Sequence, residues 1–185
     1  MEYFTIQDAL SRSQYYGSPQ VAQRILKEEV RNSNLQKTYD IFLSHSYADA
    51  QMILGAAEIL RNAGYSVYVD WIEDAHLDRS NVTQESADLV RKRMRSCKWL
   101  VYATSENSSN SKWMPWELGY FDGFRPDCVA IFPLVRSSIS TFKGQEYLSL
   151  YPTITKGLPS NSLGTRNPTS LKIYDGRLER TFKAA

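Results

Sequence analysis

Short apolar runs alternate with amphipathic helical patterns between residues 39 and 135, and this alternation limits the folds open to the chain. An apolar run bounded by polar turns is typical of a buried strand. Strands that alternate with helices form a parallel sheet with helices on both faces. The sequence therefore predicts an α/β fold. The expected strands are 39–43, 65–70, 99–103 and 129–135, and the expected helices are 49–63, 83–95 and one around Glu117.

Glycine and proline refine the ends of these elements. Gly64 predicts the end of the helix that begins at Asp49, because glycine readily adopts the left-handed cap conformation. Pro133 cannot donate to a strand ladder, so pairing of the fourth strand is expected to end near it. Farther along the chain, 146–151 is expected to form a short strand or helix, and 171–174 a late strand.

Three segments are expected along the chain. Residues 1–37 are predicted to be an N-terminal helical extension that packs on the main domain, with a helix starting at Ser18-Pro19. The alternative is an arm that binds a partner. Residues 38–175 are expected to form the α/β domain, and residues 176–185 a C-terminal tail.

Composition argues against nucleic-acid and membrane partners. The net charge of +2 gives no general attraction to nucleic acid. No apolar run approaches the length of a membrane helix, and the first residues lack the basic and apolar regions of a signal peptide. The basic residues of the 83–95 helix are expected on an outer face; they are Arg91, Lys92, Arg93 and Arg95. This face is predicted to be solvated, and the alternative is a surface for a phosphate or an acidic partner.

The two cysteines, Cys97 and Cys128, lie at the edges of predicted strands. They are interpreted as reduced thiols of a cytoplasmic protein. Two histidines and two scattered cysteines do not provide the clustered ligands of a zinc site, so no metal is expected.

The stretch 111–124 is the most unusual in the chain, because it is expected to place a carboxylate among aromatic rings. On a helix, Glu117 shares one face with residues 113, 120, 121 and 124, which are all aromatic. An unpaired buried charge is costly. Either Glu117 pairs with a basic residue or points to water, or a partly apolar pocket holds it for chemistry. Because proline suits the first helical position, the regular helix is expected to begin near Pro115, with Trp113 in an irregular first turn.

Three polar segments are expected to meet at one edge of the sheet. In parallel sheets, ligands bind at the carboxyl ends of the strands, where the strand order reverses. The Ser44-His45-Ser46 loop, the loop after Asp70 and the start of the Glu117 helix all belong to that edge. Their convergence favours a functional role for Glu117.

The chemistry expected at this edge is cleavage of an N-glycosidic bond. The sequence has no G-x-G-x-x-G after its first strand, no P-loop and no G-x-S-x-G elbow, which argues against dehydrogenases, P-loop enzymes and serine hydrolases. A single carboxylate can stabilise the oxocarbenium-like sugar that forms when such a bond breaks. If the departing base is nicotinamide, it leaves as a neutral molecule and needs no general acid.

Two motifs resemble those of the Toll/interleukin-1 receptor (TIR) family. The segment 39–46 resembles the first box of the family, and Ser111-x-Trp113-x-x-x-Glu117-Leu118 resembles the W-x-x-x-E helix of bacterial, NAD-cleaving members. The resemblance covers about residues 38 to 150 and implies a flavodoxin-like parallel sheet flanked by helices. It also implies that Glu117 is the catalytic residue. The substrate-binding residues it implies are Ser44, His45, Ser46, Tyr47, Asp70, Trp71, Ser111 and Trp113.

A narrower resemblance is to the TIR component of the Thoeris anti-phage system. It rests on the size of the chain and on the absence of a membrane segment or a fused effector domain. It implies that NAD is a substrate and that no cofactor is needed. It also implies a cyclic ADP-ribose signal that reaches a separate effector protein, and self-association through TIR surfaces. The loop 70–82 lacks the Pro-Gly of receptor adaptors, which argues against an animal signalling adaptor.

Two other functions remain compatible with these patterns. A non-enzymatic TIR interaction module would use Glu117 structurally and would assemble without NAD. A nucleoside deoxyribosyltransferase-like enzyme also uses a carboxylate on a similar fold, and it would exchange bases on deoxynucleosides but leave NAD intact.

Overall fold

A computed structural model describes residues 2–13, 38–70, 83–105, 107–138, 142, 144–157, 171–174 and 179–181; for Tyr47 and 179–181 it describes the backbone only. The helix expected after Ser18-Pro19, the loop 71–82 with Trp71, and the end of the C-terminal tail lie outside the described residues.

A single mixed sheet forms the centre of the fold, and most of its strand pairs are parallel. Its order is β3-β2-β4-β5-β6-β7-β8, with β1 paired to β5. The parallel strands β2 to β6 thus have the order second, first, third, fourth, fifth, which is the flavodoxin-like arrangement. This confirms the predicted fold class. The strands are β1 (Phe4–Thr5), β2 (Tyr39–Ser44), β3 (Val67–Tyr68), β4 (Cys97–Thr104), β5 (Val129–Val135), β6 (Thr153–Lys156), β7 (Leu171–Tyr174) and β8 (Glu179–Thr181).

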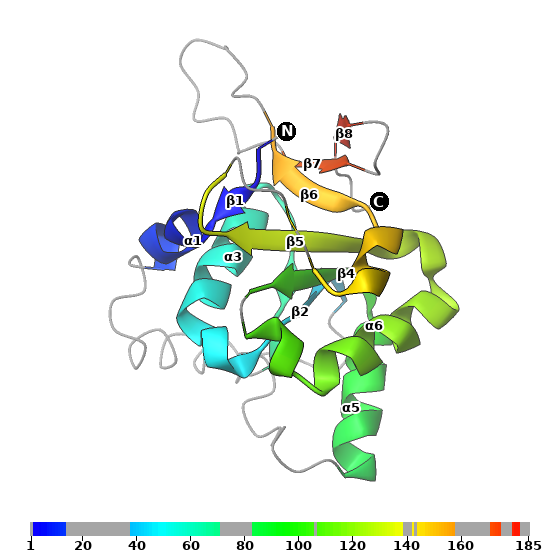
Figure 1. Cartoon of the computed structure of the whole chain (residues 1–185). Coiled ribbons are helices and arrows are strands. Elements are labelled where there is room, and N and C mark those ends of the chain that lie inside the picture. The colour runs from blue at the N-terminus through cyan, green and yellow to red at the C-terminus, as the bar shows by residue number, and fades with distance from the viewer. Residues whose placement is uncertain are drawn as a thin grey trace.

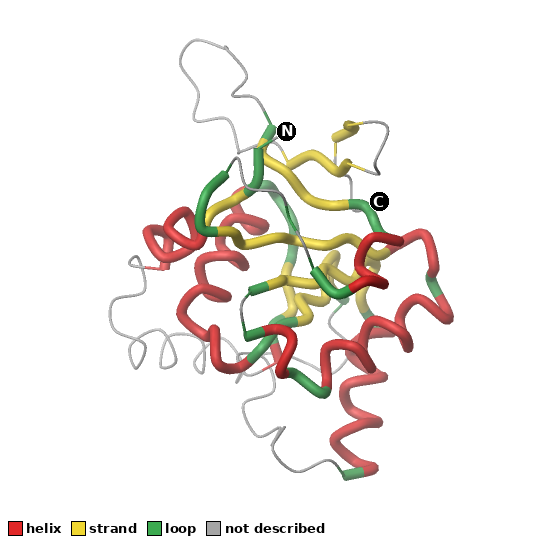
Figure 2. Tube along the Cα trace, in the orientation of Figure 1, coloured by secondary structure: helices red, strands yellow, loops and turns green. Residues whose placement is uncertain are grey.

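Helices cover both faces of the sheet. Figure 1 shows α1 (Ile6–Ser13) and α3 (Ala50–Asn62) together on one side, and α5 (Gln84–Arg95) and α6 (Trp113–Phe124) on the other. Figure 2, coloured by secondary structure, shows helices on both sides of the strands. Short 3-10 turns connect these elements. They are η2 (Tyr47–Asp49), η3 (Ser108–Asn110), η4 (Pro126–Cys128) and η5 (Glu146–Leu150). The segment that the sequence leaves as strand or helix is therefore η5.

Two hydrophobic clusters lie on the two faces of the sheet, and β2 contributes to both. Ile41 and Leu43 belong to the cluster under α1 and α3, whereas Phe42 belongs to the cluster under α5 and α6. Successive side chains of a strand point to opposite faces, so a strand covered on both sides must be apolar throughout. Gly64, with a φ of 96°, follows α3 in the predicted left-handed conformation.

The N-terminal extension contributes a strand that the sequence analysis does not predict. Phe4 and Thr5 pair in parallel with Leu134 and Val135. This pairing explains why β5 continues beyond Pro133, where its pairing with β4 ends as predicted. Helix α1 then packs on α3 so closely that a Cβ on Gly55 would lie 1.7 Å from the Ala9 carbonyl oxygen.

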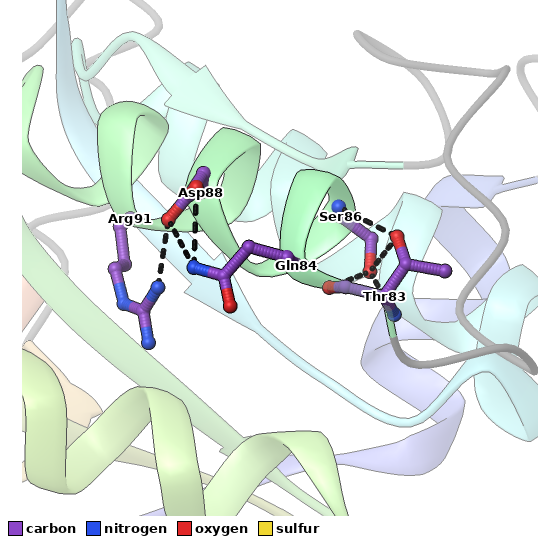
Figure 3. A network of polar contacts seen from close by, with 5 residues as sticks. All are labelled: Thr83, Gln84, Ser86, Asp88 and Arg91. Atoms are coloured by element: carbon purple, nitrogen blue, oxygen red, sulfur yellow. Dashed lines mark hydrogen bonds and ion pairs between the residues drawn. The ribbon is translucent and has the colours of Figure 1, made fainter.

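Helix α5 begins at a capping box, shown in Figure 3. The Thr83 hydroxyl accepts from the Ser86 N–H at 3.1 Å, and the Ser86 hydroxyl accepts from the Thr83 N–H at 3.0 Å. These bonds satisfy two backbone donors. Figure 3 also shows the exposed ion pair between Arg91 and Asp88. The start of α5 is therefore fixed locally.

The predicted basic outer face of α5 is wrong for one residue. Arg93 is only 2% exposed, and its guanidinium lies 5.5 Å from the centre of the Tyr68 ring. A guanidinium is planar and weakly hydrated, so it packs on an aromatic face more readily than an ammonium does. Arg93 is part of the packing between α5 and the sheet.

Candidate active site

Glu117 lies at the centre of the candidate site and is 0% exposed. The Ser44 hydroxyl, 1% exposed, donates a hydrogen bond to Glu117 Oε2 at 2.6 Å. Ser44 is the last residue of β2 and Glu117 lies in the second turn of α6. The structure thus brings the two predicted motifs, the segment 39–46 and the helix of Glu117, into direct contact. Of the alternatives considered from the sequence, a carboxylate pointing to water is excluded.

The start of α6 differs from the prediction. The helix begins at Trp113, so Pro115 is its third residue. This position still suits proline, because N–H groups of the first turn have no partner four residues earlier. The Ser111 hydroxyl accepts from the Met114 N–H at 3.2 Å and satisfies another of these donors. Ser111 therefore fixes the start of the helix that carries Glu117.

The predicted aromatic face of α6 is buried only in part. Trp113, at 9% exposure, and the fully buried Phe121 lie on the inner side with Glu117. Tyr120 is partly buried and stacks on Trp116 at 5.8 Å, beneath guanidinium groups of α5. Phe124, the last residue of α6, is 37% exposed, so the prediction that it lies in the buried face is wrong. The face that carries Glu117 is therefore no longer buried at the last residue of the helix.

The contact between Glu117 and Ser44 lies at the point where the strand order reverses. Strands β2 and β4 are neighbours there, and Ser44 pairs with Tyr102. Residues paired across parallel strands project to the same face. Tyr102 is fully buried in the cluster under α5 and α6, so its ring lies on the side of the sheet that Glu117 faces. The sequence analysis does not select Tyr102.

His45 and Asp70 form a second buried pair at the same edge. His45 Nδ1 lies 2.8 Å from the Leu43 carbonyl oxygen, and Nε2 lies 3.3 Å from Asp70 Oδ1. A carbonyl oxygen can only accept, so Nδ1 carries a proton. The pair His45–Asp70 joins the residue after β2 to the second residue after β3. Side-chain exposures of 3% and 5% show that it is shielded from water.

A third group of polar contacts joins the loops after β2 and β4. Asp49 accepts hydrogen bonds from the Ser105 hydroxyl and from Asn107 Nδ2, the latter at 2.7 Å. These residues were not selected from the sequence. They are polar residues that follow two apolar strands, β2 and β4. Because ligands bind at the carboxyl ends of parallel strands, this position could have identified them as candidates.

A cavity of about 240 Å³ lies beside this polar group on the α1 and α3 side. It includes Asp49, Ser105 and Asn107 in its lining but neither Glu117 nor Ser44. The carboxylate and the cavity are therefore separate features of this edge. The other lining residues are Ile6, Leu10, Ala48, Gln51 and Met52.

The remaining predicted site residues have these positions. Ser46 comes directly after His45 in the chain and is 9% exposed. The backbone of Tyr47 begins η2, and Trp71 lies outside the described residues. No group of three His, Cys, Asp or Glu side chains is placed to hold a metal in the part of the chain that the structure describes.

Comparison with known proteins identifies the family. Over 155 residues the chain is 52% identical to a protein of Bacillus cereus (strain MSX-D12) named "Probable 3' cyclic ADP-D-ribose synthase ThsB'", and the match covers 83% of this chain and 80% of that protein. The chain belongs to the ThsB' family of TIR proteins. No protein-family model matches the chain.

A second relative supports the same family. It is a protein of Cytobacillus dafuensis named TIR2 and described as a candidate cyclic ADP-D-ribose synthase. It is 33% identical over 98 residues, which are 51% of this chain and 26% of that protein. Both relatives are named as synthases, which favours an enzyme over the interaction module and the deoxyribosyltransferase-like alternative.

Proposed function

We propose that the chain cleaves the nicotinamide–ribose bond of NAD and releases a cyclic ADP-ribose, with Glu117 as the catalytic residue. The observation that carries this proposal is the buried Glu117 carboxylate, which Ser44 holds at the point where the strand order reverses. The names of the two relatives support the substrate and the cyclic product.

Bond cleavage needs little beyond electrostatic stabilisation. When the bond between ribose C1 and the pyridinium nitrogen breaks, the electron pair passes to the nitrogen and nicotinamide leaves neutral. The ribose is left as an oxocarbenium ion. In a site from which water is excluded, the negative charge of Glu117 stabilises that ion more strongly than it would in water.

Ring closure uses the same carboxylate. A hydroxyl oxygen of the adenosine ribose attacks the C1 cation, and its proton passes to Glu117. Water attacking the same carbon would give linear ADP-ribose instead. In the free protein, Glu117 and Ser44 are shielded from water. Bound NAD that takes the place of the covering groups keeps water away from the carboxylate in the same way, and this favours the internal hydroxyl.

The other residues of the edge position these groups. Ser44 orients the carboxylate, and the pair His45–Asp70 holds the ends of β2 and β3 together. Trp113 supplies an aromatic wall against which the nicotinamide ring stacks. The proposal keeps Ser46, Tyr47, Trp71 and Ser111 as residues of the substrate site, and NAD as a substrate with no separate cofactor.

Substrate binding requires a displacement at this edge. Glu117 has no exposed surface, whereas the reacting carbon must approach its oxygens to about 3–3.5 Å. The groups that cover the carboxylate must therefore move before NAD binds. Control of this displacement is a natural point at which activity is regulated.

The product acts as a signal in anti-phage defence under this proposal. It reaches a separate effector protein, and the chain self-associates through its TIR surfaces in the cytoplasm. Membership of the ThsB' family supports this context. None of the helices that the structure describes combines the length and apolar character that a membrane span requires.

Mass spectrometry of NAD incubated with the purified protein tests the proposal. We expect nicotinamide and a product one water lighter than ADP-ribose from the wild type. Glu117→Gln keeps the shape of the side chain but removes its charge, and we expect it to lower turnover by at least about 100-fold. Glu85→Gln is the matched control, because Glu85 is an exposed glutamate of α5.

Equal turnover by Glu117→Gln and the wild type would contradict the catalytic role. If the wild type releases no nicotinamide, either alone at high concentration or with lysate of phage-infected cells, the proposed activity is wrong.

A further inference from the structure

The hydroxyl of Tyr102 is buried without a hydrogen-bond partner among the described residues. Tyr102 lies in the middle of the sheet and is 0% exposed. Buried tyrosine hydroxyls usually find a partner, because an unsatisfied one is destabilising. An unpartnered hydroxyl in the core therefore calls for a physical reason.

Its position provides one. Tyr102 pairs with Ser44 across β2 and β4, and Ser44 donates to Glu117. Burial raises the pKa of Tyr102 well above its ordinary value, and interactions with Tyr147 and the Glu117 charge raise it further. The phenol therefore lies within electrostatic reach of the carboxylate and keeps its proton at neutral pH. It can donate a hydrogen bond but cannot act as a base.

Tyr147 does not provide a satisfactory partner. Its own hydroxyl donates to Oε1 of Gln145, the residue before η5. The two phenols approach closely enough for a hydrogen-bond interaction with Tyr147 to raise the pKa of Tyr102, but no hydrogen bond of normal length and angle joins them. The described side chains leave this donor available.

We propose that Tyr102 is a further substrate-binding residue of this site, whose hydroxyl donates a hydrogen bond to an oxygen of the ribose that reacts at Glu117. A ribose hydroxyl can donate to a carboxylate while its oxygen accepts from a phenol. Ser44 and Tyr102 then act from adjacent strands, Ser44 on the carboxylate and Tyr102 on the sugar. This inference rests on the proposed function for the identity of the sugar.

The proposal predicts an unusual pair of effects. If the hydroxyl serves only the substrate, its removal does not weaken the free protein, because no bond within the chain is lost. Replacing an unsatisfied buried hydroxyl with hydrogen is neutral or stabilising. A structural hydroxyl would behave in the opposite way.

Tyr102→Phe tests this, with ADP-ribose as the probe. We expect the melting temperature of the free variant to equal or exceed that of the wild type. We expect its affinity for ADP-ribose to fall by about 3- to 10-fold, which is the range for one neutral hydrogen bond. We expect kcat/KM for NAD to fall by at least as much.

Tyr120→Phe is the matched control. The Tyr120 hydroxyl is also buried and without a partner in the described part of the chain, but its ring stacks on Trp116 under α5. We expect its melting temperature to be equal or higher too, and its ADP-ribose affinity and turnover to be unchanged.

Three results would overturn the proposal: no binding of ADP-ribose to the wild type at millimolar concentration, unchanged affinity in Tyr102→Phe, or an equal loss of affinity in both variants. Because binding is measured without turnover, it tests Tyr102 even if the proposed activity fails. Conversely, loss of activity in Glu117→Gln with full ADP-ribose affinity in Tyr102→Phe leaves the proposed function intact.

Discussion

Replacing Ser44 with alanine removes the hydroxyl that donates to Glu117 Oε2 at 2.6 Å. Both residues are almost completely buried, so water does not readily replace the lost donor. A hydrogen bond to a charged group contributes about 1.5–3 kcal/mol. We therefore expect Ser44→Ala to lower the free energy of unfolding by about 1.5–3 kcal/mol and the melting temperature by about 3–12 °C. Turnover should fall by about 10- to 100-fold.

Urea unfolding followed by tryptophan fluorescence measures the loss of stability. Trp113 and Trp116 lie on the helix that carries Glu117, so the signal reports on this region. Ser13→Ala is the matched control, because Ser13 is also buried but donates to the neutral Leu10 carbonyl. We expect it to lose only about 0.5–1.5 kcal/mol.

A Ser44→Ala variant that is no less stable than Ser13→Ala would refute the reasoning. It would mean that the carboxylate is fully stabilised by its other interactions and that the short contact with Ser44 adds nothing. Full turnover in a folded Ser44→Ala protein would separately refute the role of Ser44 in positioning Glu117.

Three further predictions concern packing, helix propensity and burial. Gly55→Ala should displace α1 from α3, at a cost of about 1–3 kcal/mol, because the new Cβ would meet the Ala9 carbonyl; faster hydrogen exchange in α1 would show it, and unchanged exchange would contradict it. Gly119→Ala, whose Cβ meets nothing within 4 Å, should instead stabilise the protein by up to about 1 kcal/mol. Burial raises the pKa of Cys97 to about 12, so a thiol reagent at pH 8 should modify Cys128 but leave Cys97 intact until the protein unfolds. Fast modification of Cys97 in the native protein would contradict the buried environment.

Most of the sheet could be predicted from local patterns. The runs at β2, β4 and β5 are apolar because helices cover both of their faces, and this leaves a direct trace in the sequence. The strand β1 leaves no such trace. Two residues are too few for a periodic pattern, and their strand character comes from pairing with Leu134 and Val135.

Side-chain environments on the helices were harder to predict. The periodicity of α5 places Arg93 among basic neighbours, but the Tyr68 ring beneath the helix allows its guanidinium to be buried. For α6, the face of Glu117 was predicted correctly for Trp113 and Phe121 and wrongly for Phe124. Periodicity describes the direction of a side chain, whereas burial depends on whether another element lies there.

The sequence by itself determined the alternation of strands and helices, the two boxes around Ser44 and Glu117, and the edge of the sheet at which they meet. Only the tertiary structure decided that these two side chains are hydrogen-bonded across 73 positions of sequence and that His45 pairs with Asp70. It alone also decided that Tyr102 pairs with Ser44 across neighbouring strands and keeps a buried hydroxyl without a partner among the described residues. The physical reason is the distance along the sequence over which each kind of interaction acts. Helix and strand patterns arise from neighbours within a few residues, whereas contacts at the site depend on strand order and register.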